Sequence, residues 1–283
     1  MFHVCSNYVF NWISRQGHVK EESLTDWILY DISQQCDYVH YQAFSRHEEA
    51  QNGSDWEWWI LTTDKRKRDG FNAYRFLVQA KKLFPDGRDN YSLISYANKY
   101  GTQVDLLIDS AQRRNALPMY MFYSTGKPDT LEQIKNVNYI DSYAHEWCEN
   151  CINGCYVSLA KVVYDLLFNM PRTKIIDSKL LNYSFKFSIL DLVFEKSGEE
   201  ISLIMDRFNK DLIMKKIIHT KDIYNMSNMG VKGIKHDEKS IPDYLKLFIQ
   251  TMSSRDADLG WIENEMKIND ISGLGVVDLR RIS

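Results

Sequence analysis

Two neighbouring stretches of the chain, residues 55–61 and 74–81, are rich in aromatic and aliphatic side chains. This composition is typical of strands, in which successive side chains point to opposite faces of a sheet. The residues between them, 63–70, are mostly charged and end in Asp69-Gly70, a dipeptide that favours a tight turn. The pattern therefore predicts a β-hairpin.

Outside the hairpin, apolar residues recur at helical spacing in some segments and form short β-prone runs in others. The helical segments are residues 20–36, 91–115, 155–168 and 241–252, and the β-prone runs are 37–44, 117–124, 185–192 and 273–279. The hairpin is followed by a helix and then by a strand, and such a crossover connection places the strand parallel to its partner. We therefore expect an α/β fold with a mixed β-sheet flanked by helices.

The chain of 283 residues is long enough for one large domain with a substantial core. We expect residues 1–170 to form that core and residues 171–283 to form a C-terminal extension, with helical additions, that packs on it and completes one domain. Hydrophobic residues make up 44% of the sequence, which is typical of globular proteins. The net charge of -3 gives no overall basic field, so any binding of nucleic acid depends on local clusters.

The sequence also bears on the compartment. No apolar stretch approaches the length of a membrane span. The N-terminus lacks the basic start and the small-residue cleavage site of a signal peptide. The odd number of cysteines, five, argues against a secreted disulfide framework. We therefore expect a cytoplasmic protein without a membrane partner.

Four polar side chains on the predicted hairpin carry the chemical signal. Asp55 and Glu57 share one face of their strand, and Gln79 and Lys81 share one face of theirs. Carboxylate and amide oxygens suit Mg²⁺, and an ammonium group neutralises charge that develops on a phosphate. The same alternation also fits a half-buried strand whose charged face is solvated, so both interpretations stay open at this point.

The D-x-E…Q-x-K arrangement of these four residues resembles the PD-(D/E)XK nuclease superfamily, which has the restriction-endonuclease-like fold. The chain is most similar to an uncharacterised, mostly bacterial family of that superfamily, over about residues 20–165. The motifs are residues 53–59 (GSDWEWW), 78–82 (VQAKK) and 103–109 (QVDLLID). The spacing between the first two motifs is long for the superfamily, and its third position is a glutamine rather than an acid, as in some active members.

This resemblance implies a restriction-endonuclease-like core and a metal-dependent endonuclease that hydrolyses phosphodiester bonds, with DNA as the favoured nucleic acid. Asp55 and Gln79 would bind Mg²⁺ or Mn²⁺, Glu57 or Glu22 would assist, and Lys81 would position the attacking water. Glu22 lies at the start of the first predicted helix, where the helix dipole alone also explains an acid.

The family type further implies a role in bacterial defence against phage or foreign DNA. A homodimer and a partner protein from a defence system are both compatible with that role. The alternative is a non-catalytic, nuclease-derived module that binds nucleic acid or protein, because folds outlive their chemistry.

Two features of the hairpin are candidates for contacts with nucleic acid. The basic run Lys65, Arg66, Lys67 and Arg68 lies at its tip, where it is either a solvated loop or a group of phosphate contacts. Trp59 shares the face of the carboxylates and is the one tryptophan there that is placed to stack on a base. Trp56 and Trp58 point the other way, so we expect them in the core.

A second cluster, His145, Cys148, Cys151 and Cys155, has the ligand types of a Cys₃His zinc site. Zinc sites usually take two ligands from each of two elements, whereas these four residues lie within 11 positions. Free cysteines are often buried, and Cys155 begins a predicted helix. A Zn²⁺ site and unpaired cysteines therefore remain as alternatives, and we favour the unpaired cysteines.

Overall fold

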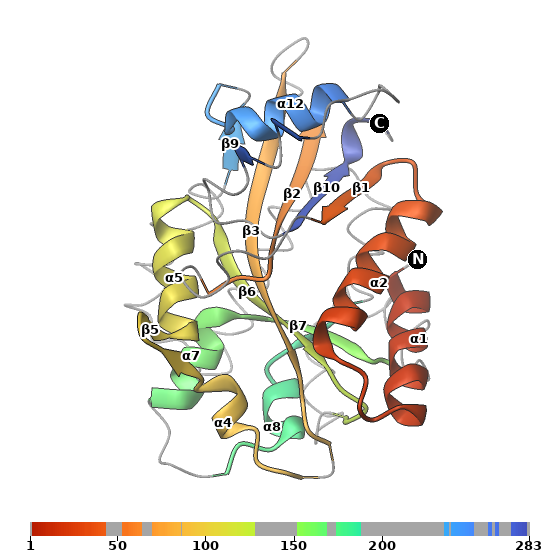
Figure 1. Cartoon of the computed structure of the whole chain (residues 1–283), viewed down its shortest axis with the longest axis vertical. Coiled ribbons are helices and arrows are strands. Elements are labelled where there is room, and N and C mark those ends of the chain that lie inside the picture. The colour runs from red at the N-terminus through yellow and green to blue at the C-terminus, as the bar shows by residue number, and fades with distance from the viewer. Residues whose placement is uncertain are drawn as a thin grey trace, which may run out of the picture.

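The computed structural model describes residues 2–43, 53–63, 70–85, 87–127, 152–168, 174–187, 235–237, 239–251, 260–261, 264–265 and 273–281. Its main strands are β1 (Val39–Ala43), β2 (Trp56–Thr63), β3 (Phe71–Lys82), β6 (Leu117–Tyr123), β7 (Cys155–Leu159), β8 (Phe185–Lys186), β9 (Lys235–Asp237) and β10 (Gly273–Asp278). They form one mixed sheet in the order β1-β10-β2-β3-β6-β7-β8, and β9 pairs with β3 (Figure 1). The predicted α/β class with a mixed sheet flanked by helices is confirmed.

The predicted hairpin is present as β2 and β3, which pair antiparallel with Trp56 opposite Val78 and Thr63 opposite Phe71. β3 is the longer strand, so residues 79–82 continue beyond the first residue of β2. On its other side β3 pairs parallel with β6, where Gln79 lies opposite Tyr120. This parallel pairing confirms the crossover connection that the order of elements predicted.

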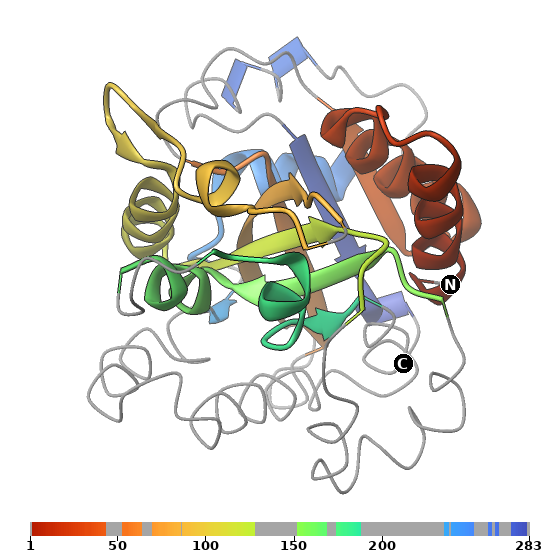
Figure 2. The ribbon, with the colours of Figure 1, turned by 90° about the horizontal axis from the view of Figure 1, so that it is seen from below.

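The main helices are α1 (Phe2–Arg15), α2 (Glu21–Gln35), α5 (Gln103–Arg113), α7 (Ala160–Phe168) and α12 (Asp243–Thr251), with two short ones, α4 (Tyr91–Ile94) and α8 (Asp177–Leu181). Figure 2 shows α1 and α2 on one side of the central strands and α5 and α7 on the other. Leu24, Ile28 and Ile32 of α2 are buried in the core, as their helical spacing predicted. The sequence pattern did not predict α1, whose buried face includes the small polar side chain Ser6.

The predicted helix 91–115 is wrong in its first half. After α4 the chain forms two short antiparallel strands, β4 (Ala97–Asn98) and β5 (Gly101–Thr102), before α5 begins. Gly101 has a φ of +141°, which is not helical. Tyr96 and Tyr100, expected on an apolar helical face, are exposed. The second half of the prediction is confirmed, because α5 buries its apolar positions.

The predicted helix 155–168 is also wrong in its first third. All five residues of β7 are buried, and β7 pairs antiparallel with β6 on one side and with β8 on the other. A strand that is buried on both faces loses the alternation of apolar and polar residues, so a short apolar run does not distinguish it from a buried helix. The helix α7 follows it directly.

Elements near the C-terminus complete the sheet. β10 lies between β1 and β2, antiparallel to the first and parallel to the second, which confirms the predicted strand at 273–279. The predicted helix at 241–252 is present as α12, and its side chains pack on Trp59 and Leu61 of β2. Of the β-prone run 185–192, only β8 and Phe187 lie within the described residues. No helix in the described ranges is long and apolar enough to cross a membrane.

Candidate functional site

The candidate site lies where β3 continues beyond the start of β2. Asp55 directly precedes β2, and its backbone N–H donates to Val78 O at 2.8 Å. Beyond the first residue of β2, two carboxylates accept the β3 N–H groups that a longer β2 would have accepted. Asp55 Oδ2 accepts from the Ala80 N–H at 2.6 Å, and Glu21 Oε2 accepts from the Lys82 N–H at 2.6 Å. The end of β3 is therefore a place where acidic side chains satisfy backbone donors of the sheet.

Gly53 allows the loop that carries Asp55 to approach α5. Its φ is +72°, a conformation that favours glycine. A Cβ at this position would lie 2.5 Å from Gln103 O and 2.7 Å from Leu107 N. Because any larger residue would clash with the backbone of α5, this glycine is what lets Asp55 lie beside the first turn of that helix.

Glu21, and not the predicted Glu22, is the acid that α2 contributes. Glu21 Oε1 lies 3.8 Å from the Nζ of Lys81, whereas the Glu22 side chain is exposed. The expectation for Glu22 assumed the wrong helical phase. Position 21 lies three residues before Leu24, so it shares the inward face of α2, and position 22 does not. The spacing of the apolar residues of this helix is therefore enough to predict that Glu21 faces inward.

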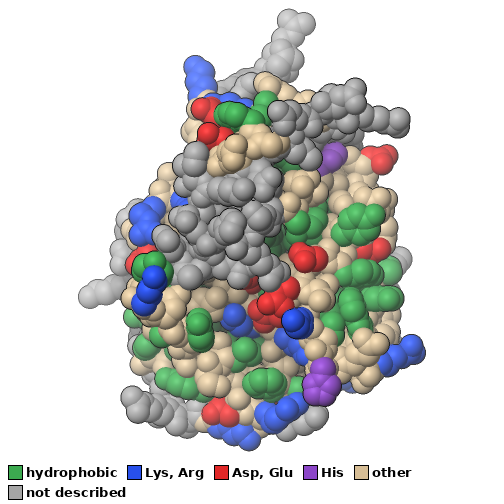
Figure 3. Space-filling model, viewed as in Figure 1, with side chains coloured by type: hydrophobic (Ala, Val, Ile, Leu, Met, Phe, Trp, Pro, Cys, Tyr) green, Lys and Arg blue, Asp and Glu red, His purple; other side chains and the backbone are tan. Residues whose placement is uncertain are grey.

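Lys81 and Lys82 point to opposite faces of β3 and have different partners. Lys81 is only 9% exposed and approaches Glu21 on the side of Asp55 and Gln79. Lys82 Nζ donates to the carbonyl oxygens of Gly17 and Val19 at 2.6 and 2.7 Å, which ties the turn between α1 and α2 to the sheet. Burial lowers the pKa of Lys82 despite the nearby Glu21 carboxylate. Figure 3 shows acidic side chains beside basic ones (Lys or Arg) near the middle of the molecular face that it draws.

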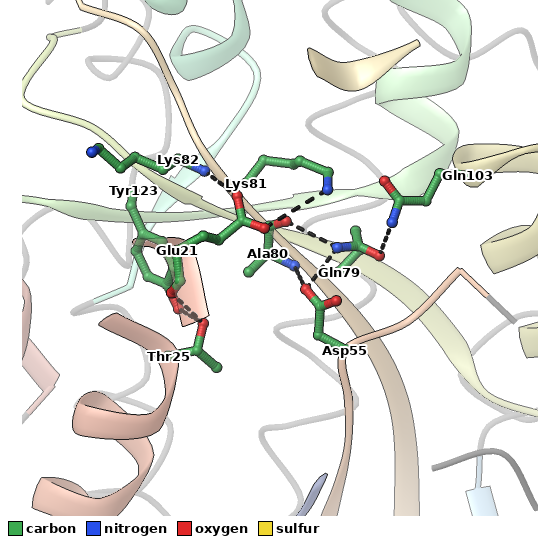
Figure 4. A network of polar contacts seen from close by, with 9 residues as sticks. All are labelled: Glu21, Thr25, Asp55, Gln79, Ala80, Lys81, Lys82, Gln103 and Tyr123. Carbon is green, nitrogen blue, oxygen red and sulfur yellow. Dashed lines mark hydrogen bonds and ion pairs between the residues drawn. The ribbon is translucent and has the colours of Figure 1, made fainter. Parts of the chain in front are cut away.

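A chain of amide contacts completes the site (Figure 4). Gln79 is 1% exposed, and its Nε2 donates to Asp55 Oδ2 at 2.6 Å and to Ala80 O at 3.0 Å. The Nε2 of Gln103, the first residue of α5, donates to Gln79 Oε1 at 2.7 Å. Gln103 lies in a motif of the resemblance, but nothing in the sequence assigned it a role, since only the packing of α5 on β3 brings it here.

Tyr120 is a second neighbour that sequence reasoning missed. It lies opposite Gln79 on β6 and is fully buried, and its hydroxyl has no hydrogen-bond partner within the described residues. Burial raises the pKa of Tyr120 well above its ordinary value, and the charges of Asp55, Asp105 and Glu21 raise it further. The hydroxyl therefore stays protonated and can serve as a donor beside the acidic end of β3.

Glu57 does not join this site, although it shares a strand face with Asp55. It is completely buried, and its carboxylate accepts hydrogen bonds from Arg75 Nη2 at 2.8 Å, from Trp59 Nε1 and from Tyr244 OH. Burial by itself lowers the pKa of Arg75, but the attraction of Glu57 and Tyr244 outweighs it, so the pKa is raised. Three donors already hold both oxygens, so the expectation that Glu57 assists at the metal site is corrected to a structural role.

Glu57 is buried because α12 packs over this part of the sheet. Tyr244 comes from α12, and the apolar neighbours of Glu57 on β10 and β2 are buried under that helix. Trp59 is likewise fully buried and bonded to Glu57, so the expectation that it stacks on a base is wrong. Trp56 and Trp58 are buried in the core on the opposite face, as expected.

Two predicted groups fall largely on parts of the chain that the structure leaves undescribed. Lys65, Arg66, Lys67 and Arg68 lie outside the described residues, as do His145, Cys148 and Cys151. Cys155 is described: it is a free, buried cysteine at the start of β7, and its backbone N–H donates to Ser6 Oγ at 3.0 Å. Burial raises the pKa of the Cys155 thiol.

The oxygen atoms around Asp55 are of the type that Mg²⁺ or Mn²⁺ prefers: a carboxylate, the amide oxygen of Gln79 and the carbonyl oxygen of Ala80. Within the described ranges, no three His, Cys, Asp or Glu side chains converge so that they could hold a metal. One carboxylate and neutral oxygens would therefore have to serve as the protein ligands of a divalent cation. Gln79 turns its NH₂ group to Asp55, so its amide has to rotate before its oxygen can serve.

Comparison with known proteins gives one match. The model of a protein family described as "Family of unknown function (DUF6615)" matches residues 1–198 of the chain, which therefore belongs to that family. No curated protein and no solved structure matches. The matched region contains Glu21, Asp55, Gln79, Lys81 and Gln103, whereas α12 and β10 lie beyond it.

Proposed function

Because the chain belongs to a family whose function is unknown, its activity has to be inferred from the site, and we propose that the protein is a metal-dependent nuclease that hydrolyses phosphodiester bonds, with DNA as the favoured substrate. The proposal includes Mg²⁺ or Mn²⁺ as the cofactor and a restriction-endonuclease-like core within the α/β fold. It places the chemistry at the end of β3.

One observation carries this proposal. A carboxylate, a carboxamide and an ammonium group, from Asp55, Gln79 and Lys81, lie together on one face of the hairpin, and Glu21 joins them from α2. Asp55 directly precedes β2, Gln79 and Lys81 belong to β3, and Glu21 belongs to α2. Three separate parts of the chain therefore supply these groups. An arrangement of this kind is what hydrolysis of a phosphodiester needs: oxygen ligands for a cation and a fixed positive charge beside them.

Each residue has a distinct part in the proposed reaction. A bound divalent cation would stabilise charge on the phosphoryl oxygen and lower the pKa of a coordinated water. Asp55 and the oxygen of Gln79 would hold that cation. Lys81 would orient the attacking water and stabilise charge on the phosphate, and Glu21 would fix the position of the Lys81 ammonium group. Glu57 has no part, because its carboxylate is held by Arg75 in the core.

The wider biological role rests on the resemblance to the superfamily alone. A function in bacterial defence against phage or foreign DNA, in the cytoplasm and as a homodimer or with a partner protein, remains an expectation. The basic residues 65–68 would supply phosphate contacts if they lie near the bound strand.

The test is incubation of the purified protein with duplex and single-stranded DNA and RNA, in the presence of Mg²⁺, Mn²⁺ or EDTA. We expect cleavage of at least one DNA substrate with a divalent cation and none with EDTA. An Asp55→Ala variant, purified in parallel, excludes a contaminating nuclease. Absence of cleavage under all conditions, together with absence of Mg²⁺ and Mn²⁺ binding, would refute the proposal.

One observation favours the non-catalytic alternative. Both site carboxylates already accept backbone N–H groups of β3, so Asp55 and Glu21 also have a structural explanation as caps of an unpaired strand end. In that case the protein would be a nuclease-derived module that binds nucleic acid or protein. Binding of nucleic acid that is indifferent to divalent cations, without cleavage, would support this alternative.

A further inference from the structure

The Gln79 carboxamide occupies the position that a cation at Asp55 would need. Its Nε2 lies between Asp55 Oδ2, at 2.6 Å, and Ala80 O, at 3.0 Å. Both hydrogens of this NH₂ group are thus directed at oxygens that would otherwise be ligands. As long as the amide keeps this orientation, it acts as a neutral substitute for the cation.

Gln103 holds the other end of that carboxamide. Its Nε2 donates to Gln79 Oε1 at 2.7 Å, which keeps the oxygen of Gln79 turned away from Asp55. The position of Gln103 is itself fixed, because its backbone N–H donates to Tyr96 O at 2.9 Å and Thr102 caps the start of α5. The Oε1 of Gln103 is buried and has no hydrogen-bond partner within the described residues.

The two amides can reverse together. A carboxamide has nearly the same shape when its oxygen and its NH₂ group exchange places. After both side chains turn, Gln79 Nε2 donates to Gln103 Oε1, the Nε2 of Gln103 takes the place that its Oε1 had, and Gln79 Oε1 faces Asp55 and Ala80 O. Three oxygens then converge, which is unfavourable when the site is empty and favourable around a hard divalent cation.

We infer that Gln79 and Gln103 form a coupled amide switch, in which Gln103 is the positioning residue that decides whether Gln79 offers Asp55 an NH₂ group or an oxygen. This inference rests on the proposed function, since it concerns the same cation. It also accounts for a glutamine in place of the acid at position 79. A glutamate at position 79 always presents an oxygen to Asp55. A glutamine presents its NH₂ group until a bound cation favours the reversed amide.

The test measures binding of Mg²⁺ and Mn²⁺ by calorimetry in the wild-type protein, Gln103→Met, Gln79→Glu and the double variant. Methionine keeps the length of the side chain without charge. It removes the donor for the present orientation of Gln79 and the acceptor for the reversed one, and a buried N–H without an acceptor is tolerated less well than a buried carbonyl oxygen without a donor. Gln103→Met should therefore weaken binding of the cation, by less than the roughly tenfold that one whole net hydrogen bond corresponds to. In the Gln79→Glu background, Gln103→Met should cause no loss of affinity for the cation, because the carboxylate at position 79 has no NH₂ group that needs an acceptor.

The side-chain amide signals of the unaltered protein provide a second measurement. On titration with Mg²⁺, the ¹⁵N–¹H signals of Gln79 and Gln103 should shift with the same midpoint. In Gln79→Glu, the signal of Gln103 should hardly move. Assignments follow from the signals that disappear in Gln79→Glu and in Gln103→Met.

The outcomes separate this inference from the proposed function. If the wild type binds a cation, and Gln103→Met has no effect or the same effect in both backgrounds, the amide switch is refuted and the metal site stands. If none of the four proteins binds Mg²⁺ or Mn²⁺, both the switch and the metal-dependent function are refuted. A wild type that binds the cation while only Gln79 shifts also refutes the switch.

Discussion

Replacing the buried Glu57 by leucine should destabilise the fold severely. The carboxylate is 0% exposed and accepts from Arg75 Nη2 at 2.8 Å, from Trp59 and from Tyr244. Without it, the guanidinium stays buried, with the Arg114 carbonyl oxygen at 2.9 Å as a remaining acceptor. Breaking a buried ion pair from one side costs about 3–5 kcal/mol. We expect a loss of that size in the free energy of unfolding.

The double variant Glu57→Leu/Arg75→Met makes this prediction specific. It removes both charges, so we expect a cost of only about 1–3 kcal/mol, mainly from the unsatisfied Trp59 N–H and Tyr244 hydroxyl. Urea denaturation followed by tryptophan fluorescence measures both variants against the wild type. If Glu57→Leu alone costs less than about 1 kcal/mol, the network does not hold this carboxylate. Glu57 would then return as a candidate ligand.

Three further predictions use pairs of neighbouring groups or the pH. Glu21→Gln should slow cleavage roughly 10- to 100-fold by misplacing Lys81, whereas Glu22→Gln, on the exposed face of α2, should leave the rate unchanged. Lys81→Ala should reduce turnover by about 10²-fold with little change in Mg²⁺ affinity, whereas Lys82→Ala should lower the unfolding midpoint and leave turnover intact; the opposite pattern would exchange their roles. Stability should fall above about pH 9, because burial raises the pKa of several groups above their ordinary values of about 9 for cysteine and about 10 for tyrosine. Their stabilising effect is complete below those values and is lost as the pH rises, by about 1.4 kcal/mol per pH unit for each group that ionises only in the unfolded chain. Melting curves between about pH 7 and pH 11 test this, and Tyr123→Phe should make the decline less steep. The groups are Tyr120, Tyr123, Cys155, Tyr156 and Tyr244.

The hairpin could be predicted because its signals are local. Alternation with period two and a charged segment between two β-prone runs place Asp55 and Gln79 on one face, and the structure brings them within hydrogen-bond distance. Asp55 itself lies just before β2 rather than in it, and its N–H donates to the carbonyl oxygen of Val78, the residue that lies opposite Trp56 in the hairpin. The expected parallel partner of β3 followed from the handed geometry of crossover connections.

The role of Glu57 could not be predicted from the hairpin, because it depends on a distant part of the chain. Alternation gives Glu57 the same face as Asp55, but only the docking of α12, through Tyr244, decides that this carboxylate is buried with Arg75. Gln103 is a similar case. Its role depends on how α5 packs against β3, and the sequence pattern around it predicted a longer, uninterrupted helix.

The choice between Glu21 and Glu22 was within reach of the sequence. The inward stripe of α2 contains Leu24, Ile28 and Ile32, and position 21 continues it at a spacing of three residues. Placing Glu22 at the start of the helix led to the wrong acid, since the helix begins at Glu21. β7 was a different kind of failure, because a five-residue strand buried on both faces has no periodicity to read.

The most direct test of the central claim compares cleavage by the wild type, Asp55→Ala and Glu57→Gln on one DNA substrate in Mg²⁺, with the folded fraction of each protein measured in the same buffer. We expect Asp55→Ala to be folded and inactive, because a polar side chain is lost from the end of β3 and no core volume is removed. Glu57→Gln should be less stable, yet each folded molecule should cut at the wild-type rate. Cleavage by Asp55→Ala at the wild-type rate would contradict the assignment of the site.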